Sequence, residues 1–308
     1  MNTKVKGYVL GAVAAATYGM NPLFALPLYE DGMSTDSVLF FRYLFAIPIL
    51  GLMLKFRGRD FSVNAKELSM LAAMGLLLSL SSLTLFLSYS YMDAGIASTM
   101  LFVYPIMVAV LMTVFFKEKL TLQTIVCIGL ALSGIGLLYQ NSDGSTLSLM
   151  GTGLVFLSAF SYALYIVGVN RAPLSGMATL KVTFYVLFFG LSIYIVRLGM
   201  AGTMELPTKW YLWGNLLALA IFPTCISFLC TTSAIQYIGS TPTAILGALE
   251  PVTAIFFGVT VFGEVLTMRE AVGVILIIAA VSFVVAGGKV ATLFIRLRKL
   301  FPRIILRR

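Results

Sequence analysis

Residues 105–121 read PIMVAVLMTVFFKEKLT, and residues 251–267 read PVTAIFFGVTVFGEVLT. The two stretches begin 146 residues apart, and each starts with proline and ends with Glu-x-Leu-Thr. They align without a gap, so Glu118 in the first stretch corresponds to Glu264 in the second. The chain therefore contains a duplicated unit.

The composition places this unit in a membrane. Hydrophobic residues make up 60% of the chain, charged residues 11%, and the mean hydropathy is +1.00. Soluble domains carry about 25% charged residues, so a soluble globule is excluded. Ten apolar runs are long enough to cross a bilayer as helices, namely 6–27, 34–54, 67–90, 94–116, 121–139, 148–169, 176–199, 211–236, 240–262 and 268–287. The sequence thus predicts an all-α integral membrane protein with ten transmembrane helices.

The number of crossings in each copy decides how the copies are oriented. The second copy begins at the sixth run, so residues 6–139 and residues 148–287 form two repeats of five helices each. A weaker match supports this division, because Tyr18 and Tyr162 lie 144 residues apart at corresponding places. An odd number of crossings inverts the second repeat in the bilayer. Inverted repeats are typical of secondary transporters, whose binding site lies near the midplane between the repeats.

Basic residues are distributed unevenly among the loops. If the N-terminus is cytoplasmic, 16 of the 21 lysines and arginines lie in cytoplasmic segments. Basic residues are enriched on that side of membrane proteins, so we expect both termini in the cytoplasm. The net charge of +9 then reflects membrane orientation and not nucleic-acid binding. The tail, residues 288–308, mixes basic with apolar residues, which is typical of an amphipathic segment on an anionic inner leaflet.

The sequence offers little for metal or cofactor chemistry. It contains no histidine, which is the commonest zinc ligand and proton shuttle. Cys127, Cys225 and Cys230 all fall within apolar runs and form no CxxC pair. A phosphate-binding GxxxxGK[ST] loop is also missing from the sequence. We expect neither a cofactor nor a metal, and no ATP motor in this chain.

Two stretches carry a resemblance to a known family. Residues 104–139, YPIMVAVLMTVFFKEKLTLQTIVCIGLALSGIGLLY, and residues 250–287, EPVTAIFFGVTVFGEVLTMREAVGVILIIAAVSFVVAG, each resemble the end of an EamA domain. Two such domains are the pattern of the drug/metabolite transporter superfamily. The resemblance implies two inverted five-helix repeats around a central cavity, alternating access, and movement of amino acids or other small metabolites, usually outward. The first repeat departs from the pattern, because Lys117 replaces the usual glycine before the glutamate.

The residues that the repeats share are interpreted as structural. Pro105 and Pro251 each lie about eleven residues into a helix, which is roughly 17 Å deep at 1.5 Å per residue. Because proline removes a backbone donor, the pair predicts two hinges near the bilayer middle, although proline is also a common simple kink in membrane helices. Glu118 and Glu264 lie at helix ends in polar loops, so we expect them to cap the next helices.

Three ionisable side chains fall inside the predicted spans, where charge is expensive and suggests function. Glu250 corresponds to Tyr104 of the first repeat; it would bind an ammonium group, carry a proton, or act as a hydrogen-bonded structural acid. Arg42 would clamp a carboxylate or phosphate, or else snorkel to the outer interface. Lys181 lies near the cytoplasmic end of its helix, which favours snorkelling.

Polar residues of helices 1 and 6 are candidates to line the same cavity, unless they only bond neighbouring helices. They are Tyr18, Asn21, Tyr162 and Tyr165, with Tyr104 from helix 4.

The sequence therefore favours a secondary transporter and not an enzyme. We expect it to export a small polar metabolite, such as an amino acid, whose carboxylate meets Arg42 and whose ammonium meets Glu250, with protons as a candidate coupling ion. A channel or receptor is the alternative. A membrane-embedded lipid-modifying enzyme is a further one, although no cluster of Asp, Glu or His lies near one membrane face. We expect a bacterial inner membrane as the location, and the sequence does not specify the oligomeric state.

Overall fold

The structure is a computed structural model of the chain. It describes residues 3–88, 91, 97, 100–119, 121–138, 148–170, 174–201, 203–261 and 268–286. Two sequence predictions lie outside the described residues, namely those for Glu264 and for the tail at 288–308.

The described residues form helices joined by turns and loops, without a strand among them. In chain order the main helices are α1 (Thr3–Tyr18), α2 (Asn21–Glu30), α3 (Thr35–Phe56), α4 (Ala65–Ser88), α6 (Tyr104–Phe116), α7 (Leu122–Leu138), α8 (Leu149–Val169), α9 (Thr179–Ala201), α10 (Leu212–Leu219), the π-helical segment η2 (Ala220–Ile226), α11 (Ser227–Ile238), α12 (Ser240–Leu246), α13 (Leu249–Val261) and α14 (Met268–Ala286). A short 3-10 turn, η1 (Leu174–Gly176), precedes α9.

These helices are suited to a bilayer. Within the described residues, seven helical stretches are long and apolar enough to cross a membrane, and three shorter apolar helices accompany them, Tyr104–Phe116, Leu122–Leu137 and Ala271–Phe283. A bilayer core offers no water to backbone N–H and C=O groups, so an uninterrupted apolar run satisfies them by forming a helix. The predicted all-α integral membrane protein is confirmed, whereas the count of ten spans stays a prediction.

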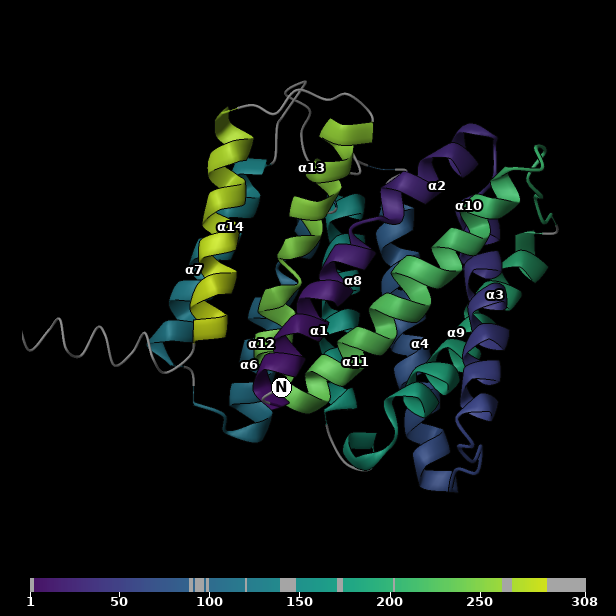
Figure 1. Cartoon of the computed structure of the whole chain (residues 1–308). Helices are drawn as coiled ribbons and strands as arrows, with labels where there is room; N and C mark the ends of the chain where they lie inside the picture. The colour runs from purple at the N-terminus through teal and green to yellow at the C-terminus, as the bar shows by residue number, and fades with distance from the viewer. Residues whose placement is uncertain are drawn as a thin grey trace, which may run out of the picture.

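The helices pack into one bundle in which the two halves of the chain are interleaved (Figure 1). The largest contacts pair a helix of the first half with one of the second: α7 with α14, α4 with α8, α1 with α11, and both α3 and α4 with α9. The α4–α9 contact is close because glycines face it. A Cβ on Gly75 would lie 2.5 Å from the carbonyl oxygen of Val186, so only glycine fits there without movement.

Several helices are interrupted within the bundle. A turn at residues 19–20 separates α1 from α2, and a turn at residues 247–248 separates α12 from α13. Another turn, at residues 102–103, immediately precedes α6, whose first turn contains Pro105. Proline fits the first turn of a helix because the amide it lacks has no partner there. Both prolines of the repeat thus lie in the first turn of a helix that follows a break, Pro105 in α6 and Pro251 in α13.

The two ends of the bundle are fastened differently. We call the end where α1 begins the N face and the end where α2 turns into α3 the far face (Figure 1). At the far face, Arg197 forms two hydrogen bonds to Asp36, at 3.2 and 2.9 Å, from the α9 end to the α3 start. Thr208 donates through its amide and its hydroxyl to Asp31, and these bonds hold the pKa of that carboxyl below its usual range.

Further bonds reinforce both ends. The Glu205 carboxylate accepts from the Ser34 amide, and the Glu205 amide donates to the Ser37 hydroxyl at 3.0 Å. At the N face, Lys181 donates to the Ser62 carbonyl at 2.6 Å, which places its ammonium at the loop between α3 and α4. The hydroxyl and amide of Ser62 donate to Asp60 and lower the pKa of its carboxyl.

Candidate functional site

Glu250, in the first turn of α13, faces a small polar cavity inside the bundle. The cavity leaves about 10 Å³ accessible to water, which is room for roughly one molecule. Its walls come from α1, α6, α8, α11, α12 and α13, and the lining residues are Gly11, Ala14, Ala15, Tyr104, Tyr162, Ile166, Thr231, Thr243, Gly247 and Glu250. We call this the central cavity.

Local backbone geometry brings Glu250 to this place. The chain turns at Gly247, and the Glu250 amide donates back to the Gly247 carbonyl at 2.9 Å. The helix then restarts at Leu249, and Pro251 lies in its first turn, where an amide has no partner within the helix. The break in the first helix lies against this restart, since a Cβ on Gly19 would come within 2.5 Å of the Glu250 carbonyl oxygen. Two interrupted helices, one from each half of the chain, therefore meet at Glu250.

Tyrosines form one side of the central cavity. The Tyr104 hydroxyl donates to the Ala244 carbonyl at 3.1 Å, which connects α6 with the C-terminal part of α12. Tyr162 meets the Tyr104 ring edge-on, with centroids 4.9 Å apart, and Tyr165 stacks behind it at 6.0 Å. The Glu250 carboxyl lies within electrostatic range of the Tyr104 and Tyr162 hydroxyls.

This arrangement bears directly on the duplication. Tyr104 and Glu250 occupy the same position in the two repeats, 146 residues apart, and both line the central cavity. Corresponding positions of a duplicated chain can meet where the two copies touch. The copies differ at that point, because one contributes a phenol and the other a carboxyl group.

Arg42 is buried in α3, with 2% of its surface exposed. Its Nε donates to the Thr224 hydroxyl at 2.5 Å, and its Nη2 donates to the Pro223 carbonyl at 3.1 Å. The guanidinium also lies 5.7 Å from the Tyr18 ring centroid and 5.9 Å from that of Phe228. A side chain held this way does not reach the outer interface, so the snorkelling alternative does not describe it.

The partner of Arg42 is an irregular part of the eighth predicted span. Pro223 lies within η2 and has no amide hydrogen to give to the Leu219 carbonyl one turn earlier. The Thr224 hydroxyl donates to that carbonyl instead, at 2.7 Å. The same hydroxyl accepts a hydrogen bond from Arg42, so the buried cation binds at the interruption that the proline creates. Pro223 was not among the predicted site residues, although a proline followed by threonine inside an apolar run was a usable signal.

Arg42 has neutral partners only, within the part of the chain that the structure describes. No described carboxylate lies within 4.0 Å of its guanidinium. Burying an ion without an opposite charge costs several kcal/mol, so such residues are seldom kept for stability alone. The arrangement leaves a fixed positive charge able to receive an anionic group.

Not every predicted site residue lines the central cavity. Tyr165 stands behind Tyr162, and Asn21 and Arg42 lie outside the lining. Asn21 begins α2 at the break of the first helix, and its side-chain oxygen is buried without a hydrogen-bond partner among the described residues. Tyr18 connects the two regions, because its ring lies under Arg42 and its hydroxyl is within electrostatic range of Tyr104.

The cavity also contains residues that sequence reasoning missed. Thr243 and Gly247 line it from α12 and its terminal turn. Gly247 stands four residues before Pro251, where the proline leaves a carbonyl without its usual donor, so a small residue there was a detectable sign of a break. At the other shared motif, the hydrogen bond that begins α7 comes from Thr121, whose hydroxyl accepts from the Thr124 amide at 3.1 Å. The cap role predicted for Glu118 remains untested.

Broken helices that meet at a polar cavity inside a membrane bundle are features of membrane transporters. The sequence profile of the EamA-like transporter family matches residues 5–140 and 149–286, so the chain belongs to that family. An uncharacterized transporter of Archaeoglobus fulgidus is 26% identical over 194 residues, which span 61% of this chain and 66% of that protein. The uncharacterized transporter YcbK of Bacillus subtilis is 23% identical over 269 residues, 84% of this chain and 85% of that protein.

The fold also matches a solved structure. A protein crystal structure superimposes with a TM-score of 0.76 at 16% sequence identity, covering 94% of this chain and 98% of the other. At this identity the likeness concerns the fold alone.

Proposed function

We propose that this protein is a secondary transporter that exports a small zwitterionic metabolite of the amino-acid type by alternating access. The carboxylate of the substrate would meet Arg42 and its ammonium would meet Glu250. The proposed architecture has ten spans in two inverted repeats, with the N face in the cytoplasm of a bacterial cell. The carrying observation is a buried cation, Arg42, over the Tyr18 ring, together with an acid, Glu250, that lines the central cavity where broken helices from both halves converge.

Packing between the halves supports the proposed repeat arrangement. The third helix of the first half, α4, packs on α8, the first helix of the second half. The converse pair, α1 with α11, has a contact of the same kind. The fifth helices of both halves, α7 and α14, pack on each other. A two-fold axis between the repeats would produce this exchange of partners.

The fastening of the two ends supports alternating access. At the far face, ionic and hydrogen bonds from Asp31 and Asp36 connect the α2–α3 turn with Arg197 and Thr208. The central cavity is too small for a metabolite, whereas a larger pocket of about 200 Å³ opens towards the N face. Among the described residues, these bonds and this pocket support a conformation that is closed to the far side and partly open to the proposed cytoplasm. Release to the outside would require the far-face bonds to separate.

The proposal is tested with the full chain in proteoliposomes. Vesicles loaded with the twenty amino acids are followed for efflux of each compound by mass spectrometry, with protein-free vesicles as the control. At least one zwitterion should leave faster than from the control, and external acidification should change that rate if protons are exchanged. Glu250→Gln keeps the size of the side chain and removes its charge, so it should abolish both effects. Wild-type rates and pH dependence in Glu250→Gln would refute the assigned role.

Transport rates also separate the proposed carrier from a channel. A carrier passes through one conformational cycle per substrate, so its flux saturates with concentration and stays far below that of an open pore. Ion currents across a planar bilayer containing the protein, well above carrier turnover, would identify the channel alternative.

A further inference from the structure

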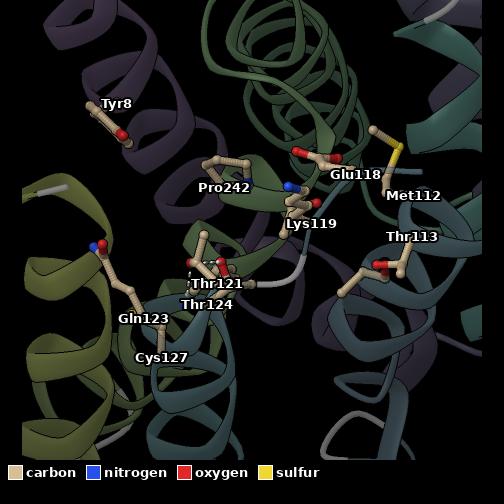
Figure 2. A pocket seen from close by; sticks show the side chains of 13 residues that line it. Tyr8, Met112, Thr113, Glu118, Lys119, Thr121, Gln123, Thr124, Cys127 and Pro242 are labelled. Carbon is tan, nitrogen blue, oxygen red and sulfur yellow. Dashed lines mark hydrogen bonds between the residues drawn. The ribbon is translucent and has the colours of Figure 1, made fainter. Parts of the chain in front are cut away.

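A second pocket lies between the central cavity and the N face. It measures about 200 Å³, twenty times the accessible space of the central cavity. Figure 2 shows Glu118 and Lys119 next to each other, with Thr121 and Thr124 at the start of α7 and Tyr8 across the pocket. We call it the N-face pocket.

The chain path places opposite charges at the rim of this pocket. α6 ends at Phe116, and the next residue, Lys117, adopts the left-handed conformation with φ 54°. In this turn the Lys117 amide donates to the Thr113 carbonyl at 3.1 Å, and the Glu118 amide donates to the Met112 carbonyl at 3.2 Å. The turn reverses the chain, so Glu118 and Lys119 both line the pocket.

The remaining walls complement a small amphipathic molecule. The start of α7 brings the hydroxyl groups of Thr121 and Thr124, which together with the ammonium of Lys119 favour a carboxylate. Glu118 supplies the opposite charge for an ammonium group. Met112, Pro242 and Ile245 provide apolar surface between these polar groups. No single charge dominates the pocket, which distinguishes it from a site for a simple anion or cation.

The same three helices line both cavities at successive depths. α6 contributes Tyr104 to the central cavity and Thr113 to the N-face pocket, nine residues or roughly 13 Å further along the helix. α1 and α12 likewise contribute to both. Ile245, on α12, is 3% exposed and lines the N-face pocket next to Leu246, which packs against Gly11 of the central cavity. Within the described residues, Ile245 and Leu246 thus form an apolar layer between the two sites.

We infer that the N-face pocket is a second binding site for the zwitterionic substrate, occupied before the substrate passes the apolar layer to the central cavity. In it, the substrate ammonium faces Glu118 and its carboxylate faces Lys119 and the start of α7. This inference rests on the proposed transport function, and it adds a site in which the shared glutamate of the first repeat takes part directly in binding.

A native thiol provides the assay. Cys127 forms part of the pocket wall, and its rate of modification by N-ethylmaleimide in the purified full chain can be read by peptide mass spectrometry. The probes are L-valine, isobutylamine, which lacks the carboxylate, and 3-methylbutanoate, which lacks the ammonium. Competition predicts roughly tenfold slower labelling when L-valine reaches ten times its Kd. Thr113→Cys adds a more exposed reporter on the same wall, in case Cys127 reacts too slowly.

Three variants decide the outcome. Protection by L-valine should be lost in Glu118→Gln and Lys119→Gln but retained in Glu250→Gln, whose change lies in the central cavity. The inference would be overturned if L-valine protected neither reporter. It would also be overturned if isobutylamine or 3-methylbutanoate alone protected equally well, or if protection were lost in Glu250→Gln. Failure of the transport proposal is recognised separately, because wild-type protein would then show no efflux whatever the labelling result.

Discussion

Replacing Arg42 by methionine tests whether the buried guanidinium serves the substrate or the fold. The side chain makes two hydrogen bonds, and bonds from a charged donor contribute about 1.5–3 kcal/mol each. Burying the guanidinium without an opposite charge costs the folded state several kcal/mol, which offsets these bonds. Methionine has a similar volume, and the Thr224 hydroxyl can still donate to the Leu219 carbonyl. We therefore expect the free energy of unfolding to change by no more than about 2 kcal/mol.

The assay combines thermal unfolding of the purified protein with efflux from proteoliposomes. A change of that size corresponds to a shift in Tm of only several degrees, since roughly 2–4 °C accompany each kcal/mol in chains of 150–250 residues. Transport by Arg42→Met should nevertheless be lost, because no cation remains to bind the substrate carboxylate. Arg42→Lys is the matched control. It keeps the charge but cannot donate to both Thr224 and Pro223 in the same way, so it should be less stable than Arg42→Met and retain weak transport.

Two results would refute the reasoning. If Arg42→Met lowers the free energy of unfolding by more than about 4 kcal/mol, the main role of Arg42 is to stabilise η2. Wild-type efflux by a stably folded Arg42→Met would exclude the guanidinium from substrate binding.

Further predictions concern the frame around the site. Lys117→Gly should raise Tm by the equivalent of about 1 kcal/mol, because a left-handed residue with a Cβ is strained by that order and glycine is not; an unchanged Tm would argue against strain at this turn. Gly75→Ala should destabilise by about 1–3 kcal/mol, because its Cβ would meet a backbone carbonyl of α9 at 2.5 Å. Gly153→Ala, where a Cβ meets nothing within 4 Å, should be neutral or stabilising, and equal melting of the two variants would contradict the close α4–α9 contact. A double-mutant cycle of Asp36→Asn and Arg197→Gln should give a coupling energy of only about 0.5–1 kcal/mol, since Arg197 is 38% exposed; no measurable coupling would remove this ion pair from the far-face closure.

Features governed by local chemistry were predictable from the sequence. Long apolar runs form helices in a bilayer because their backbone groups have no water to bind, so the all-helical membrane class followed from composition. The missing amide of proline acts on its own helix, and Pro105 and Pro251 both lie in the first turn of a helix that follows a turn, whereas their role as hinges stays a prediction. The correspondence of Tyr104 with Glu250 also followed from the alignment of the repeats, and the two residues line one cavity.

Features governed by distant contacts were not predictable. In a membrane helix that is apolar on every side, periodicity does not reveal which face meets another helix. The partners of Arg42 lie in η2, and nothing in the α3 sequence indicates them. For the same reason, Asn21 and Tyr165 were grouped with Tyr162 by spacing, although neither lines the central cavity.

The separation between Arg42 and Thr224 has a consequence for synthesis in the cell. The two residues are 182 positions apart in the chain, and ribosomes add roughly 5–20 residues per second, so the arginine waits on the order of 10–40 s before its partner exists. During that time α3 must enter the membrane with a charge that has no η2 to receive it. Until the second half is made, the Arg42 charge therefore has to be stabilised by the insertion machinery or by water that reaches the side chain. A truncated first half would keep that charge without its partner, so we expect it to be less stable in the membrane than the full chain.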